Sequence, residues 1–107
     1  MPFQRRLNID LEIQKLVGAV DIYVPSCIVG EVERLSKRRW EAKAALNLLK
    51  KYKIYTVKSL GDEGVIEAAK ALNAYVVTND RKLIERLVHG GIGVITLKNG
   101  HLVIEYE

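Results

Sequence analysis

The chain has 107 residues, a length that suits one domain and is too short for two. Of these residues 49% are hydrophobic and 28% are charged, a composition typical of a globular protein. No apolar run approaches the roughly 20 residues of a membrane span, and no charged-then-apolar leader stands at the start, so we expect a cytoplasmic protein with no membrane partner. The single cysteine, Cys27, excludes an internal disulfide and a thiolate metal site.

The charge is distributed unevenly along the chain. The net charge is +4, but residues 34–58 hold nine basic residues against one acid and carry +8, so the remaining residues carry −4. A basic segment on an acidic body indicates a polyanionic partner such as a nucleic acid. Charge alone supports equally well a solvated, lysine-rich helix face that matters only for solubility.

Apolar periodicity predicts helices and strands in alternation. The expected helices cover the first fifteen or so residues (capped by Asn8 or Asp10), a stretch capped by Ser26, residues 40–52, residues 61–72 and a stretch beginning at Asp80. The expected strands cover residues 21–24, 54–57, 74–78, 93–97 and 102–105, with a turn at Asn99-Gly100 before the last one. The near-continuous apolarity of residues 74–78 is typical of a strand covered on both faces.

This alternation predicts the fold class. Strand–helix–strand units have right-handed crossovers and place parallel strands in one sheet with helices on both faces. We therefore expect residues 1–107 to form a single three-layer α/β/α domain with a mainly parallel sheet and a C-terminal antiparallel hairpin.

Acidic residues follow three of the predicted strands. Glu31, Asp62 and Asp80 each lie in or just before the helix after a strand, at the sheet edge where open α/β sheets bind ligands. Converging carboxylates repel one another unless a cation lies between them, and Mg²⁺ or Mn²⁺ prefers such oxygen ligands. Taken singly, however, the two aspartates are typical helix caps and the glutamate is typical of an exposed helix.

Three motifs resemble those of PIN domains, the small metal-dependent ribonucleases. They are residues 24–35 (VPSCIVGEVERL), residues 61–66 (GDEGVI) and the Thr-Asn-Asp-x-x-Leu stretch at residues 78–83. The similarity covers nearly the whole chain. It is greatest to free-standing archaeal or eukaryotic-type members linked to ribosomal RNA processing, whereas the toxins of toxin–antitoxin pairs match more distantly.

The resemblance implies roles for the matching residues. Glu31, Asp62 and Asp80 would hold Mg²⁺ or Mn²⁺ and so be catalytic, and Thr78 and Asn79 would support that site by hydrogen bonds. Hydrolysis of RNA would leave a 5′-phosphate and a 3′-hydroxyl. Basic residues of the 34–58 segment would hold the RNA backbone: Arg38, Arg39, Lys43 and Lys50.

One family motif is not found in the chain. PIN domains begin with a central strand that ends in an Asp-Thr-Asn-like motif, whereas Met1-Pro2-Phe3-Gln4 resembles the stretch that follows it. We therefore expect a rearranged or shortened sheet. The true start could lie upstream, the neighbouring strands could pair directly, or a second copy could supply the strand in a homodimer.

The predicted function is thus a metal-dependent endoribonuclease. Two alternatives stay open: a non-catalytic PIN-like domain that binds RNA or a protein partner (such as a ribosome-assembly protein), and a toxin-like nuclease held inactive by an antitoxin.

Five further residues are expected to be structural or solvated. Glu67 is expected to be solvated, and Trp40 is expected to pack against the domain body, although it could instead stack on bases. His89 suits a helix C-terminus, His101 is expected in an exposed turn, and Cys27 is expected to be a small core thiol.

Overall fold

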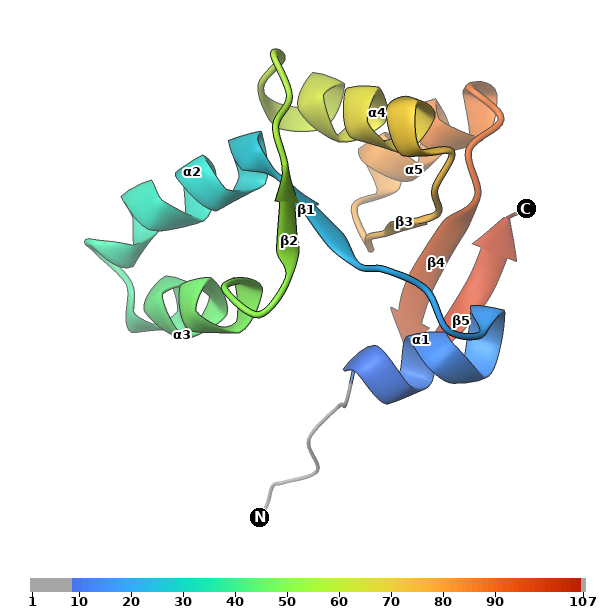
Figure 1. Cartoon of the computed structure of the whole chain (residues 1–107), viewed down its shortest axis with the longest axis horizontal. Helices are drawn as coiled ribbons and strands as arrows, with labels where there is room; N and C mark the ends of the chain where they lie inside the picture. Colours follow the sequence, from blue (N-terminus) through green and yellow to red (C-terminus); the bar gives the residue numbers. More distant parts are fainter. Residues whose placement is uncertain (1–8, 107) are drawn as a thin grey trace. The chain divides into compact units, whose positions relative to one another are not determined.

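The computed structural model describes residues 9–106 (Figure 1). None of the helices in that range has the length and apolar composition of a membrane-spanning segment. The chain divides into two compact units, Asp21–Ala74 and a second unit that combines Met1–Val20 with Tyr75–Glu107. The three-layer arrangement and the single domain stay predictions.

The unit that contains both chain ends is built on a three-stranded sheet. Its elements are α1 (Ile9–Val17), β3 (Val76–Val77), α5 (Arg81–His89), β4 (Val94–Lys98) and β5 (His101–Tyr106), and the strand order is β3-β4-β5. β3 pairs with β4 in parallel and β4 pairs with β5 antiparallel. Helix α1 packs on β5 and helix α5 packs on β4.

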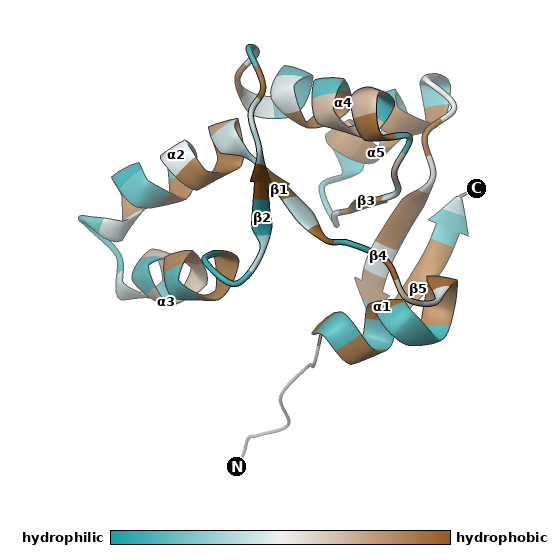
Figure 2. Cartoon of the chain, viewed as in Figure 1, coloured by the Kyte–Doolittle hydropathy of each residue, from teal (hydrophilic) through white to brown (hydrophobic). Residues whose placement is uncertain are grey.

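This unit has the denser apolar core. Leu83, Ile84 and Leu87 recur at helical spacing and form the buried face of α5. They share the core with Val94 and Ile95 of β4, a strand coloured largely as hydrophobic in Figure 2. The core fixes the helix on its strand and so fixes the turn that leads into the helix.

The other unit consists of a strand pair and three helices. Its elements are β1 (Tyr23–Pro25), α2 (Ser26–Ser36), α3 (Trp40–Leu49), β2 (Lys53–Tyr55) and α4 (Gly61–Leu72). β1 and β2 pair in parallel, and α2 packs against both α3 and α4. Val24, Cys27, Ala68 and Ala69 are buried, whereas α3 buries no residue.

Most predicted elements are confirmed. Helix α4 has the expected bounds, and the α/β class, the parallel pairing and the C-terminal hairpin are observed. At the hairpin turn Asn99 and Gly100 both have positive φ (51° and 80°), which these two residues tolerate. His89 does end α5, and Cys27 is buried.

The sheet differs from an undivided parallel sheet. Among the described residues the strands form a two-stranded and a three-stranded sheet, which confirms the expectation of a rearranged or shortened sheet. β1 and β3 belong to different sheets, so direct pairing of these two strands, one of the three alternatives, is not observed among the described residues. The strand expected at residues 74–78 is also wrong in extent, because β3 has only two residues. Val77 is 47% exposed, so the expectation that this strand is covered on both faces is wrong as well.

The cap expected at Ser26 is wrong: Pro25 occupies the cap position, Ser26 is already helical, and its hydroxyl accepts a hydrogen bond from the Val57 amide (3.0 Å). This bond ties the residue after β1 to the segment after β2. Asn8 and the Met1–Gln4 stretch lie outside the described residues.

Candidate functional site

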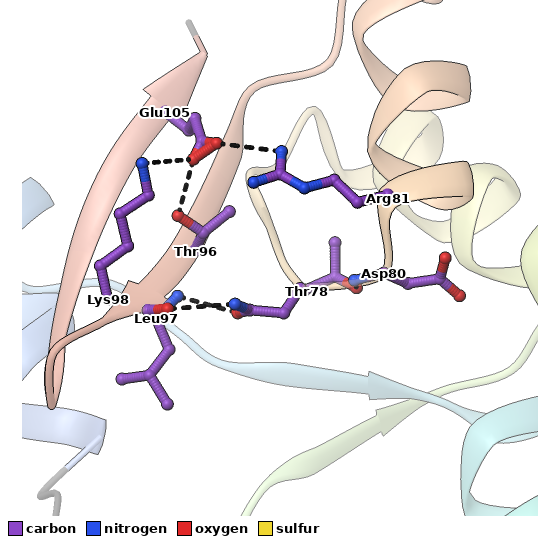
Figure 3. A network of polar contacts seen from close by, with 8 residues as sticks. Thr78, Asp80, Arg81, Thr96, Leu97, Lys98 and Glu105 are labelled. Atoms are coloured by element: carbon purple, nitrogen blue, oxygen red, sulfur yellow. Dashed lines mark hydrogen bonds and ion pairs between the residues drawn. The ribbon is translucent and has the colours of Figure 1, made fainter.

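The turn between β3 and α5 is held by the side chain of Asn79. Its amide Nδ2 donates to the Leu97 carbonyl (3.0 Å), and its Oδ1 accepts from the Leu97 amide (2.9 Å). These two bonds extend the pairing of β3 with β4, with a side chain in place of a backbone, and Figure 3 draws them as dashed lines that end on Leu97. A bidentate pair of this kind fixes both the position and the orientation of the turn.

Asp80, the next residue, caps α5. Its Oδ1 accepts from the amides of Lys82 (3.0 Å) and Leu83 (3.3 Å), while its own amide donates to the Thr78 hydroxyl (3.1 Å). The carboxylate therefore lies at the N-terminus of α5, where the helix dipole favours a negative charge. Both capping bonds use Oδ1, so a ligand bound at Oδ2 would not compete with the cap. Thr78 and Asn79 thus hold the turn that presents an exposed carboxylate.

Arg81, the residue that follows Asp80, belongs to a polar network with residues of β4 and β5. Glu105 of β5 accepts from the buried Thr96 hydroxyl (3.0 Å), and its carboxylate also contacts Lys98 (3.3 Å) and Arg81 (3.4 Å). The Thr96 bond, followed by the hydrogen bond and charge of Lys98 and the charge of Arg81, lowers the pKa of Glu105. Figure 3 shows Arg81 turned toward Glu105 and the Asp80 carboxylate turned away from it. The network therefore holds the first residue of α5 and leaves Asp80 outside it.

Glu31 and Asp62 lie in the other unit on two helices that pack together. Glu31 is exposed on α2, and Asp62 is half-buried in the first turn of α4. Unlike Asp80, Asp62 is not the cap, because Leu60 occupies that position and makes no side-chain cap bond. The interpretation of Asp62 as a helix cap is therefore wrong.

Gly64 sets the approach of α4 to α2. A Cβ at this position would overlap Cys27 Sγ and would lie 2.6 Å from the Ser59 carbonyl oxygen. A larger residue would push the start of α4, with Asp62, away from α2. Burial raises the pKa of the Cys27 thiol, as expected for a core thiol.

Glu67 is a positioning residue that the sequence analysis missed. Its carboxylate oxygens accept from the Lys58 amide (3.2 and 3.1 Å) and its Oε1 accepts from the Ser59 amide (3.1 Å). These bonds, with the Lys58 amide as the largest cause, lower the pKa of Glu67. The expectation that Glu67 is solvated is wrong, because it holds the loop that leads into Asp62. A glutamate six residues into a helix, able to reach back to the preceding loop, was the available signal.

The three predicted acids are thus distributed over two units. Glu31 and Asp62 are carried by packed helices of one unit, and Asp80 is placed within the other. Within each unit, in the part of the chain that the structure describes, no group of three or more His, Cys, Asp or Glu side chains is arranged to hold a metal ion. The three-acid site stays a prediction.

Comparisons with known proteins bear on the whole chain. The family model described as a PIN like domain matches residues 1–100. The chain belongs to the PIN-like domain family. Ribonuclease VapC4 of Methanocaldococcus jannaschii is 35% identical over 107 residues, covering 90% of this chain and 81% of that protein.

Two further proteins resemble this PIN-like domain. Ribonuclease VapC9 of Archaeoglobus fulgidus is 31% identical over 80 residues, which cover 70% of this chain and 59% of that protein. The solved structure of the PIN domain endonuclease Utp24 matches with a TM-score of 0.81 over 94% of this chain and 79% of that chain. Its sequence identity is 18%, so that likeness bears on the fold alone.

Proposed function

We propose that this PIN-like domain is a metal-dependent endoribonuclease. The observation that carries the proposal is the Thr78–Asp80 turn, in which Asn79 and Thr78 hold an exposed carboxylate at a helix N-terminus. The ribonuclease names of both curated relatives support the same activity. A turn with only a structural role would need the cap but would not need a charged one, because asparagine and serine cap equally well.

The proposed ligands of the ion are Glu31, Asp62 and Asp80. The donor set fits Mg²⁺ or Mn²⁺, because all three are carboxylates and none is fully buried. A bound ion of this kind supplies an activated water and neutralises negative charge on the scissile phosphodiester. In this assignment Thr78 and Asn79 hold Asp80, while Glu67 and Gly64 hold the start of α4 and therefore Asp62.

The proposed RNA contacts lie between α2 and α3, on α3, and directly after α3. Arg38, Arg39, Lys43 and Lys50 are all exposed and belong to the segment that carries +8. Cations that contact phosphates release counterions on binding, so affinity should fall steeply as salt is raised.

The test is cleavage of labelled single-stranded RNA in Mn²⁺ and in EDTA, with wild type and Asp80→Asn purified identically. Asparagine retains the helix cap, so thermal stability should hardly change. Cleavage should fall more than about 100-fold, since even outer partners of a metal ligand are worth about 10- to 100-fold. Glu85→Gln, an exposed acid on the same helix, is the matched control. Equal cleavage by Asp80→Asn and wild type would reject the assignment.

A second candidate function is a toxin-like nuclease that a partner protein holds inactive. The VapC names of both relatives favour it. Purification of the chain with and without its neighbouring reading frames would test it. A bound small protein whose removal releases Mn²⁺-dependent cleavage is the expected result, and full activity in the presence of every neighbouring product would contradict it.

A further inference from the structure

Trp40 is exposed to solvent. It is the first residue of α3, and 77% of its surface is accessible. The expectation that it packs against the domain body is therefore wrong. Because α3 buries no residue, the helix offers its start as an open surface rather than as part of a core.

Three cations lie close to Trp40 in the sequence. Arg38 and Arg39 directly precede Trp40, and Lys43 follows it by three residues, which places it on the same side of the helix. Within residues 9–106 these three cations make no ion pair with a carboxylate. Their charges are therefore available to an anionic ligand.

An exposed indole among cations matches the chemistry of single-stranded nucleic acid. Such proteins hold phosphates with basic side chains and stack bases on aromatic rings, which every base permits through its π-face. A duplex keeps its bases stacked inside and offers an indole only phosphates and groove edges. A protein partner for a segment that carries +8 would have to be strongly acidic, and the test below separates that outcome from base stacking.

We propose that Trp40 stacks on a base of single-stranded RNA while Arg38, Arg39 and Lys43 contact the adjacent phosphates. The inference rests on the proposed function for the choice of RNA. It adds a specificity contact to that function, because stacking on Trp40 would favour single strands over duplexes and over base-free polyanions.

The chain contains one tryptophan, so tryptophan fluorescence reports on this contact directly. Asp80→Asn protein in EDTA, which leaves RNA intact, is titrated with oligouridylate, with an RNA duplex of the same length and with inorganic polyphosphate. We expect strong, salt-sensitive quenching by oligouridylate, little quenching by the duplex, and displacement of RNA by polyphosphate without comparable quenching. Equal quenching by polyphosphate, or bound RNA without quenching, would overturn the proposal.

Substitution separates stacking from charge. Trp40→Leu should weaken oligouridylate binding about 5- to 150-fold and leave polyphosphate binding unchanged, while Trp40→Phe should restore most of the affinity. Leu48→Ala, on the same helix and 41% exposed, is the control and should bind normally. Unchanged RNA affinity in Trp40→Leu would reject stacking and would leave the surface to a protein partner or a second copy.

The two proposals fail in different ways. Wild type that binds RNA through Trp40 but never cleaves it would reject the nuclease and keep the stacking contact. Cleavage that is indifferent to Trp40→Leu would keep the nuclease and reject the contact.

Discussion

The β3–α5 turn and helix α3 are opposite kinds of surface. The turn stands on a dense core, with Leu87 and Val94 fully buried beneath it and Asn79 paired twice with Leu97. Helix α3 has no fully buried residue, and Trp40 at its start is 77% exposed. Chemistry at a carboxylate requires fixed geometry, whereas holding a flexible polyanion requires charge and access. In the proposed ribonuclease, one region would therefore position the carboxylate and the other would hold the RNA.

The largest expected effect would test the core beneath the turn. Leu87→Ala removes a side chain with no exposed surface and should lower the free energy of unfolding by about 2–5 kcal/mol. Leu48→Ala on α3 should cost less than about 1 kcal/mol, because 41% of that side chain is already exposed. Urea denaturation measures both. Equal losses would remove the contrast between the two regions.

A smaller effect is expected at the approach of α4 to α2. Gly64→Ala places a Cβ against Cys27 and the Ser59 carbonyl and should cost about 1–3 kcal/mol of stability. Gly30→Ala is the matched control, because its Cβ would meet only Arg34 Nη1 at 3.6 Å. This second change lies inside α2 and should stabilise by about 0.4–1 kcal/mol. Thermal unfolding of the pair checks both signs, and a neutral Gly64→Ala would show that the contact is loose.

The smallest effect concerns pH. The folded pKa of Glu105 lies below its ordinary value, mainly through the Thr96 hydrogen bond. Its contribution to stability is therefore complete above the ordinary glutamate pKa of about 4.3 and is lost as pH falls through the lower, folded value. Glu105→Gln should flatten the acid limb of the stability–pH curve. If the wild-type and Glu105→Gln curves coincided in acid, the network behind Arg81 would have no energetic role.

Local rules predicted much of the fold. Helix α4, the glycine turn of the hairpin and the cap at Asp80 follow from residue type over a few positions. The local rules gave wrong predictions where a residue distant in the sequence determined the structure. Ser26 was available as a cap, yet its hydroxyl accepts from Val57, thirty-one residues away.

The candidate site shows the same limit. Asp62 and Asp80 both stand at helix starts, and only the bonds of each side chain separate the one that caps from the one that does not. Glu67 resembles any solvated helix glutamate in sequence, but in the structure it accepts from two loop amides. The spacing of apolar residues predicts which face of a helix is buried, but it does not predict which residues from elsewhere in the chain pack against that helix.

The amino-acid sequence by itself determined the family, the α/β class, the acidic motif residues and the basic segment, because these depend on residue type and short spacing. Only the tertiary structure decided that the strands form two sheets, that Asn79 and Glu67 fix the loops that carry Asp80 and Asp62, and that Trp40 is exposed. The physical reason is that strand pairing, loop anchoring and burial join residues far apart in the chain, where local propensity carries no information.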